Sequence, residues 1–118
     1  MGARILSGAT ATGAGPTIKS GAMNHAVLVS FANTTGSVTV LHFKFQGRIA
    51  SGGWVDLTDA INGLTESVFS AGELTAKAGY RFFKEQPVDD IRVNITTLTQ
   101  TGQGADAAVA ADYKSEKN

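Results

Sequence analysis

The stretch PVDDIRVNITTLT, Pro87–Thr99, decides the fold class of this chain. It opens with a proline and two acids and continues in strict alternation of apolar and polar residues, which is the pattern of a β-strand buried on one face. Ile91, Val93 and Ile95 share the face that we expect in the core. Arg92 begins the opposite face, which is polar and suited to meet a neighbouring subunit.

The strongest local signal lies earlier, where residues 25–50 form two alternating runs around the turn Asn33–Gly36. Two such runs joined by a short turn that contains glycine predict a β-hairpin. In that hairpin His25 would lie beside residues 43–45. The face of the second strand that we expect in the core consists of Thr39, Leu41, Phe43 and Phe45.

Short apolar runs separated by glycine-rich turns continue along the chain, which contains 14 Gly and only 2 Pro. This pattern predicts an all-β fold, an antiparallel β-sandwich of about seven or eight strands with jelly-roll-like topology. We expect one short helical turn at Asp56–Asn62, ended by Gly63. Residues 73–77 suit either a turn of helix or an extended edge. Residues 107–113 predict a final strand, although their alanines leave a helix as the alternative.

With 118 residues the chain is long enough for one domain with one hydrophobic core. We expect the β-sandwich domain over residues 23–113. Residues 1–22, rich in glycine, alanine and threonine, predict a flexible N-terminal arm or an edge strand. Residues 114–118 predict a disordered tail.

The charges balance, since ten basic and ten acidic residues give no net charge, and Lys and Arg form no cluster. We therefore expect no nucleic acid partner, because phosphate backbones require a concentrated positive surface. No apolar stretch approaches the roughly 18 residues of a membrane-spanning helix, so we expect no membrane contact. The absence of cysteine excludes disulfides, thiolate metal sites and a cysteine nucleophile.

The sequence shows no convincing catalytic or metal-binding pattern. The segment GAGPTIKS, Gly13–Ser20, departs from a phosphate-binding loop because Ile18 stands where that loop needs its second glycine. His25 and His42 belong to no metal-ligand pattern, and we expect both at the surface or in an interface. The pair Asp89–Asp90 predicts solvated acids at a strand edge rather than a calcium site. The sequence therefore predicts no enzyme, no cofactor and no metal.

Four residues are candidates for contact with a partner. Trp54 follows two glycines and belongs to the core or an interface, or else forms an exposed platform on which a sugar stacks. Phe82 and Phe83 point to opposite faces if the chain is extended there, and we select Phe83 as the one presented to a partner. Arg4 in the N-terminal segment and Arg92 on the polar strand face complete the set.

The order of these features resembles the small all-β structural proteins of tailed-bacteriophage virions. The resemblance spans residues 25–113. It rests on a GGW segment before a leucine, on a late strand with an IRV element, and on a glycine-rich turn before a last strand of alanine and valine. The matching residues are Trp54, Leu57, Ile91, Arg92 and Val93.

The resemblance implies a non-enzymatic virion protein that decorates or cements a capsid through repeated sites. Its partners would be other virion proteins, the major capsid protein or a neck or tail protein. It also implies a homo-oligomer, with a trimer favoured, that is made in the host cytoplasm and located in the virion. A head–tail connector or a tail or baseplate component of a phage is one alternative, and a carbohydrate-binding β-sandwich module is another.

Overall fold

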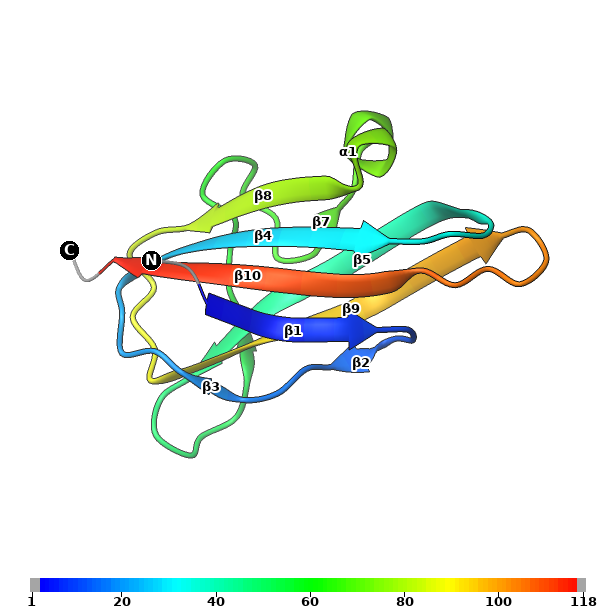
Figure 1. Cartoon of the computed structure of the whole chain (residues 1–118). Helices are drawn as coiled ribbons and strands as arrows, with labels where there is room; N and C mark the ends of the chain where they lie inside the picture. The colour runs from blue at the N-terminus through cyan, green and yellow to red at the C-terminus, as the bar shows by residue number, and fades with distance from the viewer. Residues whose placement is uncertain (1–2, 117–118) are drawn as a thin grey trace.

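The computed structural model describes residues 3–116, which form two antiparallel β-sheets around one core, with a short helix at the rim (Figure 1). Sheet A contains, in spatial order, β1 (Ala3–Ala9), β10 (Ala108–Glu116), β4 (Asn24–Ala32) and β8 (Ala78–Phe83). Sheet B contains, in spatial order, β2 (Gly13–Ala14), β9 (Asp90–Thr101), β5 (Ser37–Arg48) and β6 (Val55–Asp56). Two further short strands join sheet B, with β3 (Ile18–Lys19) pairing β9 and β7 (Ser67–Val68) pairing β5.

The two sheets have jelly-roll connectivity. The short strands β2 and β3 both pair with β9, and β6 and β7 both pair with β5, so each couple acts as one interrupted strand. Counted in this way, the ten strands become two sheets of four. Consecutive strands then lie in different sheets, except where β5 is followed by β6 and β7, which is the jelly-roll order. The predicted all-β sandwich with jelly-roll-like topology is confirmed.

The two strands expected around the turn Asn33–Gly36 exist as β4 and β5, but the predicted hairpin is wrong. β4 pairs with β10 and β8, whereas β5 pairs with β9. The turn therefore carries the chain from one sheet to the other. Alternation and turn length are the same for a hairpin and for such a sheet-crossing arch, so the sequence pattern could not separate them. His25 does lie near Phe45, with 5.5 Å between ring centroids. The two residues face each other across the core from different sheets, however, and are not neighbours within one sheet.

A second sheet-crossing arch, residues 102–107 between β9 and β10, contacts the first. Asp106 in the second arch accepts hydrogen bonds from the backbone N–H groups of Thr34 and Thr35, at 2.8 and 2.9 Å, and from the Thr34 hydroxyl. These bonds favour the ionised carboxylate and lower the pKa of Asp106. The two arches thus close the same end of the sandwich together.

The core contains the predicted faces of β5 and β9, with one local change. Leu41, Phe43 and Phe45 are fully buried, but Thr39 is exposed while Val38 is buried. The reason is a β-bulge, because the ladder between β5 and β9 shifts register directly after Val38. One extra residue reverses which side chains face the core. The predicted core residues of β9, with at most 1% of their surface exposed, are Ile91, Val93 and Ile95.

The helix lies later in the chain than the helical turn predicted at Asp56–Asn62. Helix α1 spans Ala71–Ala76 and begins with a capping box, in which the Ser70 hydroxyl accepts from the Glu73 N–H and the Glu73 carboxylate accepts from the Ser70 N–H. The turn of helix considered for residues 73–77 is therefore the correct alternative. The helical turn predicted at Asp56–Asn62 is too long, because Asp56 belongs to β6 and only one turn follows, in which the Gly63 N–H donates to the Asp59 carbonyl at 2.9 Å.

Both ends of the described chain belong to the sandwich. Residues 3–19 contribute β1, β2 and β3, so the edge-strand alternative describes them, and Ile5 and Leu6 of β1 are buried. The final strand predicted over residues 107–113 is β10, but it runs on to Glu116. Residues 114–116 are therefore part of sheet A and not of a disordered tail. Residues 1, 2, 117 and 118, parts of the expected arm and tail, lie outside the described residues.

Candidate partner interface

The outer face of sheet B carries a connected row of charged, amide and indole side chains. Alternation along β5 directs its aromatic residues into the core and its polar residues outward. The register then places Gln46 directly between Asp56 of β6 and Arg92 of β9. This sheet B row consists of Lys44, Gln46, Arg48, Trp54, Asp56 and Arg92.

Gln46 connects the two sides of the row. Its Nε2 donates to Asp56 Oδ1 and its Oε1 accepts from Arg92 Nε, each at 2.8 Å. Lys44 Nζ lies 3.0 Å from the other carboxylate oxygen of Asp56. The hydrogen bond from Gln46 and the nearby ammonium group lower the pKa of Asp56. Because Gln46 is only 8% exposed, its amide is fixed between these partners.

Trp54 lies on this face under two guanidinium groups. The guanidinium carbon of Arg92 is 4.2 Å from the centroid of the Trp54 ring, and that of Arg48 is 4.7 Å away. Such cation–π contacts contribute roughly 0.5–1 kcal/mol each at exposed sites. Trp54 is half-buried, so it is neither a core residue nor a free aromatic platform. Two of the four predicted contact residues, Trp54 and Arg92, are therefore in direct contact with each other.

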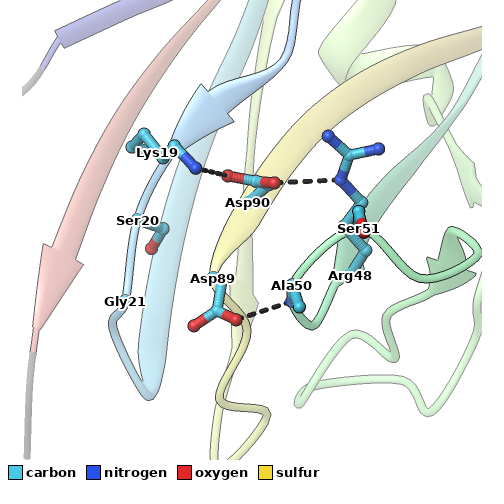
Figure 2. A pocket seen from close by; sticks show the side chains of 8 residues that line it. All are labelled: Lys19, Ser20, Gly21, Arg48, Ala50, Ser51, Asp89 and Asp90. Atoms are coloured by element: carbon cyan, nitrogen blue, oxygen red, sulfur yellow. Dashed lines mark hydrogen bonds and ion pairs between the residues drawn. The ribbon is translucent and has the colours of Figure 1, made fainter.

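At one end the row meets a polar pocket of about 520 Å³ (Figure 2). Pairing with β3 and β5 places Asp90 directly between Lys19 and Arg48. Arg48 Nε lies 2.9 Å from one oxygen of Asp90 and Lys19 Nζ lies 3.2 Å from the other. The hydrogen bond from Arg48, followed by that from Lys19, lowers the pKa of Asp90. Asp89 remains exposed and accepts from the N–H of Ala50.

The expectation that both acids are solvated therefore holds for Asp89 and is wrong for Asp90, which is 2% exposed. Its carboxylate is already matched by two cationic neighbours. Among the side chains described in residues 3–115, no group of three or more His, Asp or Glu is placed to hold a metal ion. The same described residues include no helix that is long and apolar enough to cross a membrane.

The two histidines lie in different environments. His42 is on the outer face of sheet B, with Nδ1 3.7 Å from Glu66 Oε1. His25 is buried in the core, which corrects the expected location at the surface or in an interface. Its Nε2 is 3.0 Å from the carbonyl of Gln86, an acceptor only, so Nε2 carries the proton and Nδ1 accepts from the Tyr113 hydroxyl at 2.6 Å. Both nitrogens of a neutral imidazole are thus satisfied, and burial lowers the pKa of His25.

The other two predicted contact residues lie away from the sheet B row. Arg4 is exposed on β1 at the edge of sheet A, where its guanidinium forms a two-point pair with Asp112 of β10 at 3.0 and 3.1 Å. Phe83 is 1% exposed and packs on Phe45, with 4.7 Å between ring centroids, so its selection as a contact residue is wrong. Its neighbour Phe82 points outward instead.

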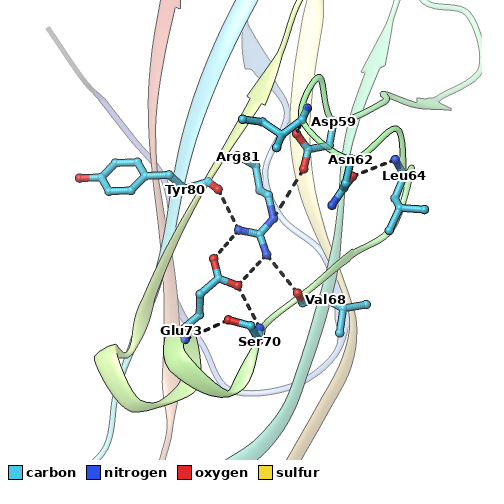
Figure 3. A network of polar contacts seen from close by, with 9 residues as sticks. Asp59, Asn62, Leu64, Val68, Ser70, Glu73, Tyr80 and Arg81 are labelled. Atoms are coloured by element: carbon cyan, nitrogen blue, oxygen red, sulfur yellow. Dashed lines mark hydrogen bonds and ion pairs between the residues drawn. The ribbon is translucent and has the colours of Figure 1, made fainter.

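A buried arginine that the sequence reasoning did not identify anchors helix α1 to β8 (Figure 3). The guanidinium of Arg81 donates to both oxygens of Glu73, at 2.6 and 2.8 Å, and to the carbonyl of Val68 at 3.1 Å. The carboxylate of Asp59 lies 3.9 Å from Arg81 Nε. The hydrogen bonds from Arg81 lower the pKa of Glu73. The network joins four chain segments, namely β8, α1, the strand that contains Val68 and the loop that contains Asp59, so we assign it to stability.

No protein-family model matches this sequence, and no curated protein matches it. Among solved structures, the crystal structure of SPBc2 prophage-derived protein YomS is similar, with a TM-score of 0.58 and 15% sequence identity. The similarity covers 96% of this chain and 90% of that chain. At this identity it establishes a shared fold. A structural neighbour of this chain is therefore a prophage-derived protein.

Proposed function

We propose that this chain is a non-enzymatic virion protein of a tailed phage that decorates or cements the capsid. The observation that carries the proposal is the sheet B row, an ordered polar and aromatic face centred on Trp54 and Arg92. The shared fold with a prophage-derived protein supports the phage origin. The partner would be the major capsid protein, on whose surface the same site recurs.

The chemistry of the row suits a protein interface. Tryptophan and arginine are the residue types that most often dominate binding energy between proteins. Arg92, Gln46 and Asp56 already hold one another in place in the unbound chain. Fewer side chains then lose freedom on binding, which lowers the entropic cost of association.

A decoration protein also gains from repetition. Several weak contacts on one oligomer give strong overall attachment when their spacing matches that of the capsid sites. We propose a homo-oligomer, with a trimer favoured, that is made in the host cytoplasm and found in the virion. Catalysis has no part in this function.

Two alternatives predict different properties. A head–tail connector or tail component would form a ring and would be present at a low copy number per particle. A carbohydrate-binding module would need a free face on Trp54, whereas two guanidinium groups lie over that ring. The geometry therefore favours a protein partner over a sugar.

The experiment that tests the proposal is quantitative mass spectrometry of purified particles from the encoding phage or prophage, combined with light scattering of the free protein. A decoration protein will be present in proportion to the capsid protein. A copy number equal to a single ring will favour the connector. Absence from the particles will refute a virion role.

A matched pair of variants tests the surface. Arg92→Ala removes a guanidinium from the sheet B row, whereas Arg4→Ala removes an exposed, ion-paired guanidinium from the edge of sheet A. We expect particle incorporation to fall for R92A and to persist for R4A. Equal incorporation of both variants would refute the sheet B row as the interface.

A further inference from the structure

The outer face of sheet A has an unusual composition for a sheet surface. Antiparallel sheets with one solvated face normally carry polar side chains on it. Here the outward positions of the central strand β4 include Ala26, Leu28 and Ser30 and carry no charge. Beside them, on the edge strand β8, the outward residues are Tyr80 and Phe82, which are 63% and 39% exposed. This face therefore presents apolar and aromatic surface to the solvent.

The strand register hollows this face into a groove. Ala26 lies directly between Phe82 of β8 and Lys114 of β10, and Leu28 lies between Tyr80 and Asp112. A methyl group flanked by two long side chains leaves a depression above it. Two adjoining hollows of about 340 and 230 Å³ result, and both are lined by Ala26, Phe82 and Lys114. We call this feature the sheet A groove.

The charges at the groove are not balanced. Lys84 and Lys114 line one of its hollows, and neither forms an ion pair with the side chains described in residues 3–115. Asp112 lines the other hollow, but its carboxylate is already paired with Arg4. The groove thus combines an apolar floor with an end at which neither lysine has an acidic partner among the described side chains.

We propose that the sheet A groove binds a segment of a partner protein that carries apolar side chains together with aspartate or glutamate. The apolar side chains would cover Leu28, Tyr80 and Phe82, and the acidic groups would pair with Lys84 and Lys114. Stacking the same face of a second copy on the groove would bring two further lysines of like charge into one interface, which disfavours that occupant. This proposal is independent of the particle to which the chain belongs.

The test is chemical-shift mapping by NMR on the full chain, with a short peptide of alternating glutamate and leucine as the probe. A peptide of alternating lysine and leucine is the control. At millimolar concentration the acidic peptide should shift signals of Ala26, Leu28, Tyr80, Phe82 and Lys114, and the basic peptide should not. Shifts that are absent, equal for both peptides or located elsewhere would overturn the proposal. Shifts of these signals on raising the protein concentration alone would assign the groove to a second copy and would also overturn it.

Variants separate the apolar and the charged contributions. Phe82→Ser should abolish the peptide-induced shifts, whereas Ile49→Ser, which changes an apolar residue that is 68% exposed and does not line the groove, should leave them intact. Lys84→Gln should weaken binding of the acidic peptide by about 2- to 5-fold, as expected for one exposed ion pair. Lys77→Gln, at an exposed position after α1, should have no effect. Equal effects of the two lysine variants would refute the role of Lys84.

Discussion

Substitution of Gly36 by alanine should destabilise the chain because two sheet-crossing arches touch at this residue. Gly36 has φ +75°, a conformation that costs an alanine about 1–2 kcal/mol. Its added Cβ would also lie 2.5 Å from the carbonyl oxygen of Thr101 and 2.8 Å from the Cβ of Ala105. Such overpacking typically costs about 1–3 kcal/mol. We expect a total loss of about 2–5 kcal/mol in the free energy of unfolding.

The matched control is Gly63→Ala. Gly63 has φ +73°, but its added Cβ would meet no atom within 4 Å, so this variant should lose only the conformational part. Alanine also lowers the conformational entropy of the unfolded chain, which stabilises both variants by a similar amount. This contribution therefore cancels when the two variants are compared. Urea titration should therefore place Gly36→Ala about 1–3 kcal/mol below Gly63→Ala. Equal losses for the two variants would refute the close contact between the arches and, with it, the assignment of residues 33–36 as a sheet-crossing turn.

Three further predictions concern buried and surface groups. Arg81→Met should lower the free energy of unfolding by about 3 kcal/mol in chemical denaturation, since it leaves the Glu73 carboxylate without its partner. The double variant R81M/E73Q should lose less than R81M alone, because it no longer leaves that carboxylate unpaired. A larger loss in the double variant would contradict this reasoning. His25 has a lowered pKa in the folded chain, so the unfolded chain binds more protons near pH 6.5, and the free energy of unfolding should decrease as the pH falls through about 6.5. His25→Gln should make this decrease smaller. An imidazole pKa of His25 at or above 6.5, measured by NMR, would contradict the prediction. Arg92→Ala should uncover Trp54, so that its fluorescence shifts to longer wavelength and acrylamide quenches it more strongly, and unchanged spectra would rule out the stacked geometry.

Alternation of apolar and polar residues correctly predicted the sandwich and the core face of β9. It also placed β4, β5 and β10 along the chain. Alternation could not predict which strands pair, because two strands around a short turn have the same sequence pattern whether they share a sheet or face each other across the core. The exposure of Thr39 was missed for a related reason, since a single bulge reverses the alternation and leaves no mark in composition.

The candidate interface was only partly predictable. Trp54 and Arg92 stand far apart in the sequence, and only the pairing of β5 with β6 and β9 brings them together around Gln46. Nothing in the residue type of Gln46 indicates that role. Phe82 and Phe83 show the limit most clearly, because a two-residue period specifies that they face opposite ways but not which of them faces the core.

The position of β10 determines when sheet A can form during synthesis. β10 lies between β1 and β4, so it joins the first described strand to the centre of the sheet. Until residues 108–116 have left the ribosome, β1 has no partner in sheet A and one edge of β4 stays open. A nascent chain at that stage exposes unpaired strand edges and core side chains, which favours aggregation. We therefore expect folding of this protein to be completed only after translation of β10, with a need for chaperone protection before that point.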